Sequence, residues 1–238
     1  MKKITSAAGL GLRLSFPNVL AMFTTVGILQ AATFWHAMKT EAGASFEFLL
    51  DEHPGFIGRF GLLSLFFALY LATSDRKGIH TSYTLRRLRL PEGAVTAIWG
   101  LMFAGWFVVY LAFQAGLGLL CYHLWADPAV TGGNFLFIAA HRSEWLHFLL
   151  PLSEPWAVAR NIIMCLACGG FAALSGTSQR HGRSAPLCMF LLGAFWWNLL
   201  WPREMASRSS DQTLIVLTLI CLFIDMIWTR RCIRDDEN

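Results

Sequence analysis

Long apolar runs, separated by short segments that hold most of the charges, are the feature that most constrains this chain. A transmembrane helix needs about 20 mainly apolar residues to cross a hydrocarbon core of roughly 30 Å. Lipid admits only helices or closed barrels, and the apolar runs lack the strict alternation of barrel strands. The sequence therefore predicts an all-α membrane protein with about six transmembrane helices. The predicted spans are Asn18–Met38, Phe56–Thr73, Ala94–Tyr122, Ala157–Leu174, Pro186–Trp201 and Thr213–Trp228.

The composition agrees with the bilayer as the solvent for this protein. Of 238 residues, 55% are hydrophobic and only 14% are charged, whereas soluble domains carry about 25% charged residues. The chain shows no fixed-period repeat and no low-complexity linker, so we expect a single transmembrane domain over residues 1–238. The net charge of +4 is explained by loops that fix orientation, and no nucleic-acid-binding motif is present, which argues against a nucleic-acid partner.

The distribution of Lys and Arg predicts that both termini are cytoplasmic. With the N-terminus inside, 13 of the 19 Lys and Arg residues fall in inner segments and six fall in outer segments. Because cytoplasmic loops carry an excess of Lys and Arg, this asymmetry favours an N-in, C-in topology. The first fifteen residues are weakly amphipathic, and they predict a helix on the membrane surface that leads into the first span.

The segment from Asn134 to Leu152 is apolar but interrupted by His141, Arg142 and Glu144. A seventh span would place these polar side chains in hydrocarbon, which is costly. We therefore predict an outer interfacial or re-entrant helix after the third span, with a seventh span as the alternative.

The loop Ser74–Glu92, between the second and third predicted spans, is the most informative part of the chain. Thr81 or Ser82 can cap a short helix, and Leu85 and Leu88 give it an apolar stripe. Its basic residues point elsewhere, and Pro91 then opens the third span. Such a cytoplasmic helix, with one apolar and one basic face, suits docking onto another protein.

The segment Tyr83-Thr84-Leu85-Arg86-Arg87-Leu88, followed by Pro91-Glu92, resembles the corresponding loop of small bacterial ABC transporter permeases of the six-helix exporter type. In that family a cytoplasmic coupling helix between spans two and three sits in a groove of the ATPase subunit. The long third span and the inner C-terminus agree with the family. The family's re-entrant element between the last two spans has no counterpart in the short loop Pro202–Gln212.

The resemblance implies a permease subunit that exports a hydrophobic or amphipathic substrate, such as a lipid, a peptide or a drug, across the bacterial cytoplasmic (inner) membrane. A separate ABC ATPase would bind ATP and Mg, because this chain has no G-x-x-x-x-G-K-[ST] phosphate loop and is not itself an enzyme. A second permease copy (a homodimer) or a related permease would complete the pathway. The implied ATPase-coupling residues are Tyr83, Leu85, Arg86, Arg87, Leu88 and Arg89.

Two other classes of function stay open from the sequence. His141, Glu144 and His147 follow one another at single helical turns, so they could share a face and bind a metal in a membrane enzyme or, less well, a haem protein. The spacing differs from the H-E-x-x-H pattern of zinc proteases. An accessory or sensor protein that docks through the same loop without transporting is the third reading. The substrate-binding residues cannot be assigned from the sequence.

A few residues inside the apolar runs lead to further expectations. Cys165 and Cys168 are one helical turn apart in an apolar run, and we interpret them as small packing residues. Gly169 and Gly170 offer a close helix contact. Asp225 is expected to pair with Arg230 or Arg231, and Arg160 to extend toward water from an outer span end.

Overall fold

The computed structural model describes residues 2–41, 43–52, 54–73, 90–126, 135–151, 154–181 and 208–237. Within these ranges the chain forms helices and no strands. Five stretches are long and apolar enough to cross a membrane, which agrees with an all-α, multi-pass membrane protein. The helices are α1 (Lys2–Thr40), α2 (Phe46–Glu52), α3 (Pro54–Thr73), α5 (Glu92–Trp125), α6 (Phe135–Arg142), α7 (Glu144–Leu149), α8 (Pro155–Arg180) and α10 (Arg208–Glu237).

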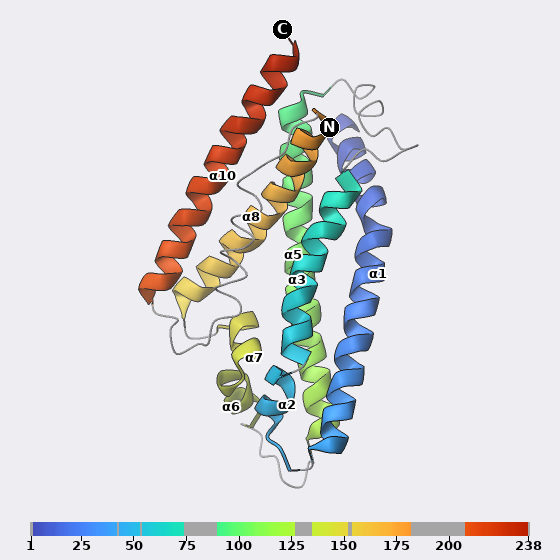
Figure 1. Ribbon diagram of the computed structural model, residues 1–238, viewed down its shortest axis with the longest axis vertical. Helices are drawn as coiled ribbons and strands as arrows, with labels where there is room; N and C mark the ends of the chain where they lie inside the picture. The colour runs from blue at the N-terminus through green and yellow to red at the C-terminus, as the bar shows by residue number, and fades with distance from the viewer. Residues whose placement is uncertain are drawn as a thin grey trace.

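The long helices stand side by side as a bundle, and both termini lie at the same end of it (Figure 1). We call this the termini end and the opposite one the far end. Helices α1 and α5 run from the termini end to the far end, whereas α3, α8 and α10 run back. Each of these five helices contains one predicted span, and α5, at 34 residues, extends beyond the predicted span Ala94–Tyr122 at both ends.

Helices α8 and α10 run in the same direction, which constrains the connection between them. Arg160 of α8 bonds to Asp211 of α10 near the start of both helices, and Ser178 bonds to Thr229 near their ends. Residues 181 and 208 therefore lie at opposite ends of the bundle. A further crossing in this interval would satisfy that geometry, but the predicted span Pro186–Trp201 lies outside the described residues and stays a prediction.

Helix α8 is the centre of the bundle, and α1 and α10 are its periphery. In the most apolar window of α8, 67% of the residues are buried, against 22% in the corresponding windows of α1 and α10. The outward faces of these helices expose large apolar side chains, including Ile28, Val216 and Phe223. Such an extensive apolar surface is not stable in water, so it is the face we expect to contact lipid.

The backbones of α5 and α8 touch because glycines line their contact. A Cβ atom added at Gly169 would collide with backbone atoms of Gly100 and Ala104, and one added at Gly100 would lie 3.4 Å from the Cα of Gly170. Small residues are what allow transmembrane helices to approach closely. The close helix contact predicted at Gly169 and Gly170 is thus confirmed, and its partner is α5.

A buried network of amides joins α1, α3 and α5 and was not predicted from the sequence. Gln30 and Gln114 donate to each other's side-chain oxygens at 2.8 and 2.9 Å. Gln30 also donates to the carbonyl of Pro54 at 2.8 Å, and the Tyr110 hydroxyl donates to the carbonyl of Gly58 at 2.7 Å. Because buried polar groups need partners, this network fixes how the three helices face each other.

Three short helices, α2, α6 and α7, close the far end of the bundle (Figure 1). Helices α6 and α7 have eight and six residues, too few to cross a bilayer, so the described part of Asn134–Leu152 is not a seventh span. The chain breaks between them at Ser143, whose hydroxyl donates to Asp51 of α2 at 2.7 Å. The other oxygen of Asp51 accepts the backbone N–H of Glu144 at 2.8 Å.

We expected a separate surface helix at the N-terminus. The N-terminal residues instead form the first turns of a continuous α1 that runs through Pro17. Their packing explains the difference. The Trp99 indole donates to the carbonyl of Ala7 at 3.0 Å, and the Trp106 indole donates to the Ser15 hydroxyl at 3.2 Å. Ala7, Gly11 and Ser15 recur every four residues, and this stripe of small residues lets α5 pack against the start of α1.

We predict that Gly169→Ala destabilises the bundle, because the added methyl group has to separate the backbones of α5 and α8. Overpacking of this kind costs about 1–3 kcal/mol, so the midpoint of heat-induced unfolding in detergent should fall by several degrees. The matched control is Gly105→Ala on α5, where an added Cβ meets nothing within 4 Å. Equal unfolding midpoints for the two variants would contradict the proposed contact.

Candidate functional site

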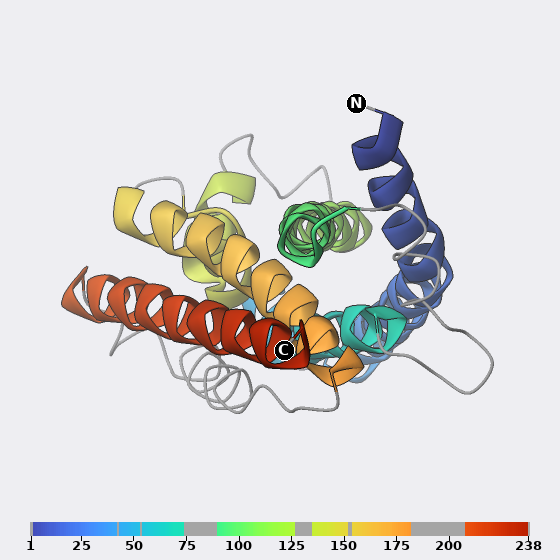
Figure 2. The same ribbon diagram turned by 90° about the horizontal axis from the view of Figure 1, so that it is seen from above.

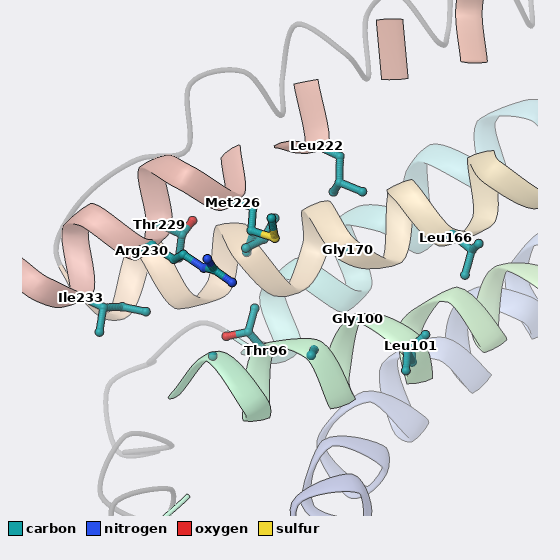
Figure 3. Close-up of a pocket in the computed structure, with 13 residues that line it drawn as sticks. Thr96, Gly100, Leu101, Leu166, Gly170, Leu222, Met226, Thr229, Arg230 and Ile233 are labelled. Carbon is teal, nitrogen blue, oxygen red and sulfur yellow. The ribbon is translucent and has the colours of Figure 1, made fainter. Parts of the chain in front are cut away.

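A groove between α5, α8 and α10 is the best candidate for a binding site in the described part of the chain. It has a volume of about 510 Å³, within the range of small-molecule sites. Helix α8 lies between α5 and α10 (Figure 2) and forms the floor of the groove, while α5 and α10 form its walls (Figure 3). Glycines at positions 93, 100 and 170 line the groove and leave space where side chains would stand.

The two ends of the groove differ in polarity. Leu101, Leu166 and Leu222 line the half nearer the middle of the bundle, and Arg230 lies at the half nearer the termini end (Figure 3). The Thr96 hydroxyl is already bonded to Thr177 at 2.8 Å. Arg230 is exposed and makes no ion pair with any described residue, so it is the charge that a ligand in the groove would meet.

A polar cluster beside this end of the groove ties together three helix ends. One carboxylate oxygen of Glu92 lies 3.4 Å from Arg180, and the other lies 2.8 Å from Nε2 of His181. Arg180 also donates to the Thr177 hydroxyl at 3.0 Å and to the carbonyl of Thr73 at 3.4 Å. Thr73 ends α3 and Glu92 begins α5. The cluster therefore holds together the two helix ends that flank residues 74–89.

At the far end, a buried ion pair holds α10 against α8. Arg160 Nη1 donates to Asp211 Oδ1 at 2.8 Å, and the two side chains are only 10% and 9% exposed. Two other nitrogens of Arg160 donate to Asn161, whose own amide donates to the carbonyl of Phe148. The expectation that Arg160 extends toward water is wrong, because Asp211 offers it a partner inside the bundle.

The three residues considered as metal ligands lie on two different helices. His141 belongs to α6, whereas Glu144 and His147 belong to α7. The rings of His141 and His147 pack with centroids 5.5 Å apart. The carboxylate of Glu144 instead lies 3.4 Å from Arg59, and His147 Nε2 lies 3.5 Å from Glu154. Among the described residues, no three His, Cys, Asp or Glu side chains converge in a way that could hold a metal ion.

Most of the predicted coupling segment lies outside the part of the chain that the structure describes. Tyr83, Leu85, Arg86, Arg87, Leu88 and Arg89 lie outside the described residues. Only Leu90, Pro91 and Glu92 of the segment are described. Helix α5 begins at Glu92, directly after Pro91, so Pro91 opens the third span as expected, and Glu92 belongs to that span rather than to a preceding helix.

Asp225 does not pair with Arg230 or Arg231. The side chain is 1% exposed, and neither carboxylate oxygen has a hydrogen-bond partner among the described residues. Five or six residues of helix place the arginines on different faces from Asp225. Asp225 instead shares the buried face of α10 with Thr229, which contacts Ser178 of α8. Cys165 and Cys168 are buried in α8, as packing residues should be.

Comparisons with known proteins gave no match, whether to protein-family models, curated proteins or solved structures.

We predict that Arg160→Met alone destabilises the protein more than the double variant Arg160→Met with Asp211→Leu. The single change leaves a buried carboxylate without its cation, which costs about 3–5 kcal/mol, whereas an apolar pair can replace a buried ion pair at little cost. Unfolding midpoints of wild type, both single variants and the double variant in one detergent give the coupling energy. Strictly additive effects would show that this pair does not hold the wall of the groove.

Proposed function

We propose that the protein is the transmembrane permease subunit of an ABC-type exporter that handles a hydrophobic or amphipathic substrate. The observation that carries this proposal is the groove between α5, α8 and α10, which is mainly apolar and has Arg230 at one end. A site of that kind fits a molecule with an apolar body and a polar head. It fits small polar solutes poorly, because most of its lining offers no hydrogen bonds.

The distribution of charge supports placing the termini end in the cytoplasm. Among the described residues, Arg180, Arg230, Arg231 and Arg234 come at or near the ends of α8 and α10 that lie at the termini end. Lys2, Lys3 and Arg13 also lie toward the termini end, whereas Lys39, Arg59, Arg142, Arg160 and Arg208 lie toward the far end. Cytoplasmic ends of membrane proteins are the ones enriched in Arg and Lys. The polar end of the groove would then face the inner leaflet of the bacterial cytoplasmic membrane.

The positions of the residues that flank 74–89 support a mechanical link to the groove. These residues connect Thr73 to Leu90, and both junctions lie next to the cluster of Glu92, Arg180 and His181. Thr96, one turn after Glu92, lines the groove. A partner that pulls on the loop would therefore act on the first turn of α5 and change the width of the groove at its polar end.

The energy for such a movement would come from a separate subunit. The sequence holds no phosphate-binding loop, so ATP and Mg would bind to the partner ATPase. In this proposal Leu85 and Leu88 enter a groove of that ATPase, and the arginines at 86, 87 and 89 pair with acidic residues at its edge. A second permease, either another copy or a related chain, provides the other half of the pathway.

We predict that the protein extracted in detergent from its native membrane brings with it an Mg-dependent ATP-hydrolysing subunit. The double variant Leu85→Asp with Leu88→Asp should lose most of that ATP hydrolysis, because two carboxylates replace the apolar stripe. The matched control is Ile79→Asp, which changes an apolar residue of the same loop outside the stripe.

The readout is the ATP hydrolysis rate per mole of purified chain. A double variant with the same rate as wild type would remove the assigned role of the loop. A wild-type preparation that hydrolyses no ATP would remove the proposed function.

A further inference from the structure

The charge at the mouth of the groove is positive. Arg230 lines the groove, and Arg231 and Arg234 follow it on the exposed surface of α10. The nearby described acidic side chains, Glu92 and Asp225, do not line the groove. Both oxygens of Glu92 are engaged by Arg180 and His181, and Asp225 lies on the buried face of α10. A ligand head at this end would therefore meet an arginine whose charge no described carboxylate neutralises.

The length of the groove matches one leaflet of a bilayer. On α5 its lining extends from Gly93 to Leu101, and on α10 from Leu222 to Ile233. At a rise of 1.5 Å per residue these stretches cover about 12 and 17 Å. Half of a hydrocarbon core of roughly 30 Å is about 15 Å. An extended acyl chain that starts at the level of Arg230 would end near Leu101 and Leu166.

Arg230 is the lining residue that determines headgroup preference, because the threonine hydroxyl groups in the lining already have partners. Thr96 is bonded to Thr177, and Thr229 to Ser178, so both hydroxyls are committed to contacts with α8. An arginine guanidinium binds phosphate oxygens through paired hydrogen bonds. No described acidic side chain at this end stands ready to bind the ammonium group of a zwitterionic lipid.

From these observations we propose that the groove binds an anionic phospholipid of the leaflet at the termini end. Its phosphate contacts Arg230, and one acyl chain lies against Leu101, Leu166 and Leu222. The inference rests on the proposed function, for which it names the substrate class. The occupant is a lipid rather than a soluble anion because the deeper lining is apolar and the bundle presents lipid-facing helices on either side.

The test measures lipid retained by the detergent-purified chain, using native mass spectrometry with phosphatidylglycerol and phosphatidylcholine of identical acyl chains. We expect the wild type to retain phosphatidylglycerol about fivefold better, since one Arg near an anionic surface contributes an attraction of that order. Arg230→Gln should bring this ratio close to one. Arg231→Gln, which removes the adjacent exposed charge outside the groove, should lower the ratio much less than Arg230→Gln does.

A second pair of variants tests the position of the acyl chain. Ala97 and Ala112 are both exposed on α5, but only Ala97 lines the groove. Ala97→Trp should fill the groove and reduce the retention of both lipids severalfold, whereas Ala112→Trp should not.

Several results would overturn the lipid assignment. An unchanged lipid ratio in Arg230→Gln would overturn the assignment. This result would hold even if Ala97→Trp failed to fold, because Arg230 is exposed and its replacement is conservative in size. Equal lipid retention in the two tryptophan variants would also overturn the assignment. A change in the mass of the assembly in Ala97→Trp, with lipid retention intact, would assign the groove to a second copy of the chain instead.

The two proposals fail separately. Loss of the lipid preference with ATP hydrolysis retained would overturn only the lipid assignment. Retained lipid preference without any associated ATP hydrolysis would support the lipid assignment and overturn only the permease function.

Discussion

The contact between the backbones of α5 and α8 at Gly100 and Gly169 is the constraint on which the rest of this bundle depends. A Cβ at position 169 would collide with the backbone of α5, so the helices approach this closely only because residue 169 is a glycine. Helix α5 presents its opposite side to α1 and α3 through Gln114 and Tyr110, and α8 presents its own to α10. The space beside the contact, which the glycines leave unfilled, becomes the groove.

Pairs of polar side chains within the bundle and at its ends connect the helices to one another. Gln30 with Gln114 joins α1 to α5, Arg160 with Asp211 joins α8 to α10, and Glu92 with Arg180 joins α5 to α8. In hydrocarbon an unpaired polar group is costly, so such pairs select one arrangement of helices among many that would bury equal apolar area. Arg160 with Asp211 and Ser178 with Thr229 hold the two ends of α10 against α8, and Thr218 and Asp225 are buried between these pairs.

The sequence was sufficient to predict the helical class and the approximate bounds of five spans, because the length of an apolar run is a local property. It also indicated the glycine contact in α8, and it favoured a helix in Asn134–Leu152 that does not cross the membrane, as the described part of that segment shows. The pairs that orient the helices could not be predicted, since Gln30 and Gln114 are 84 residues apart and Asp51 and Ser143 are 92 apart. The groove escaped prediction for a similar reason, because its lining comes from three separate helices.

The central claim is that an amphipathic molecule enters this bundle between α5, α8 and α10 at the termini end. The most direct measurement is photocrosslinking in bilayers with an anionic phospholipid that carries a diazirine in its acyl chain, followed by peptide mapping. The account predicts crosslinks concentrated on Leu101, Leu166, Leu222 and their neighbours in the groove. Crosslinks spread evenly over the exposed faces of α1 and α10, with no enrichment in the groove, would contradict it.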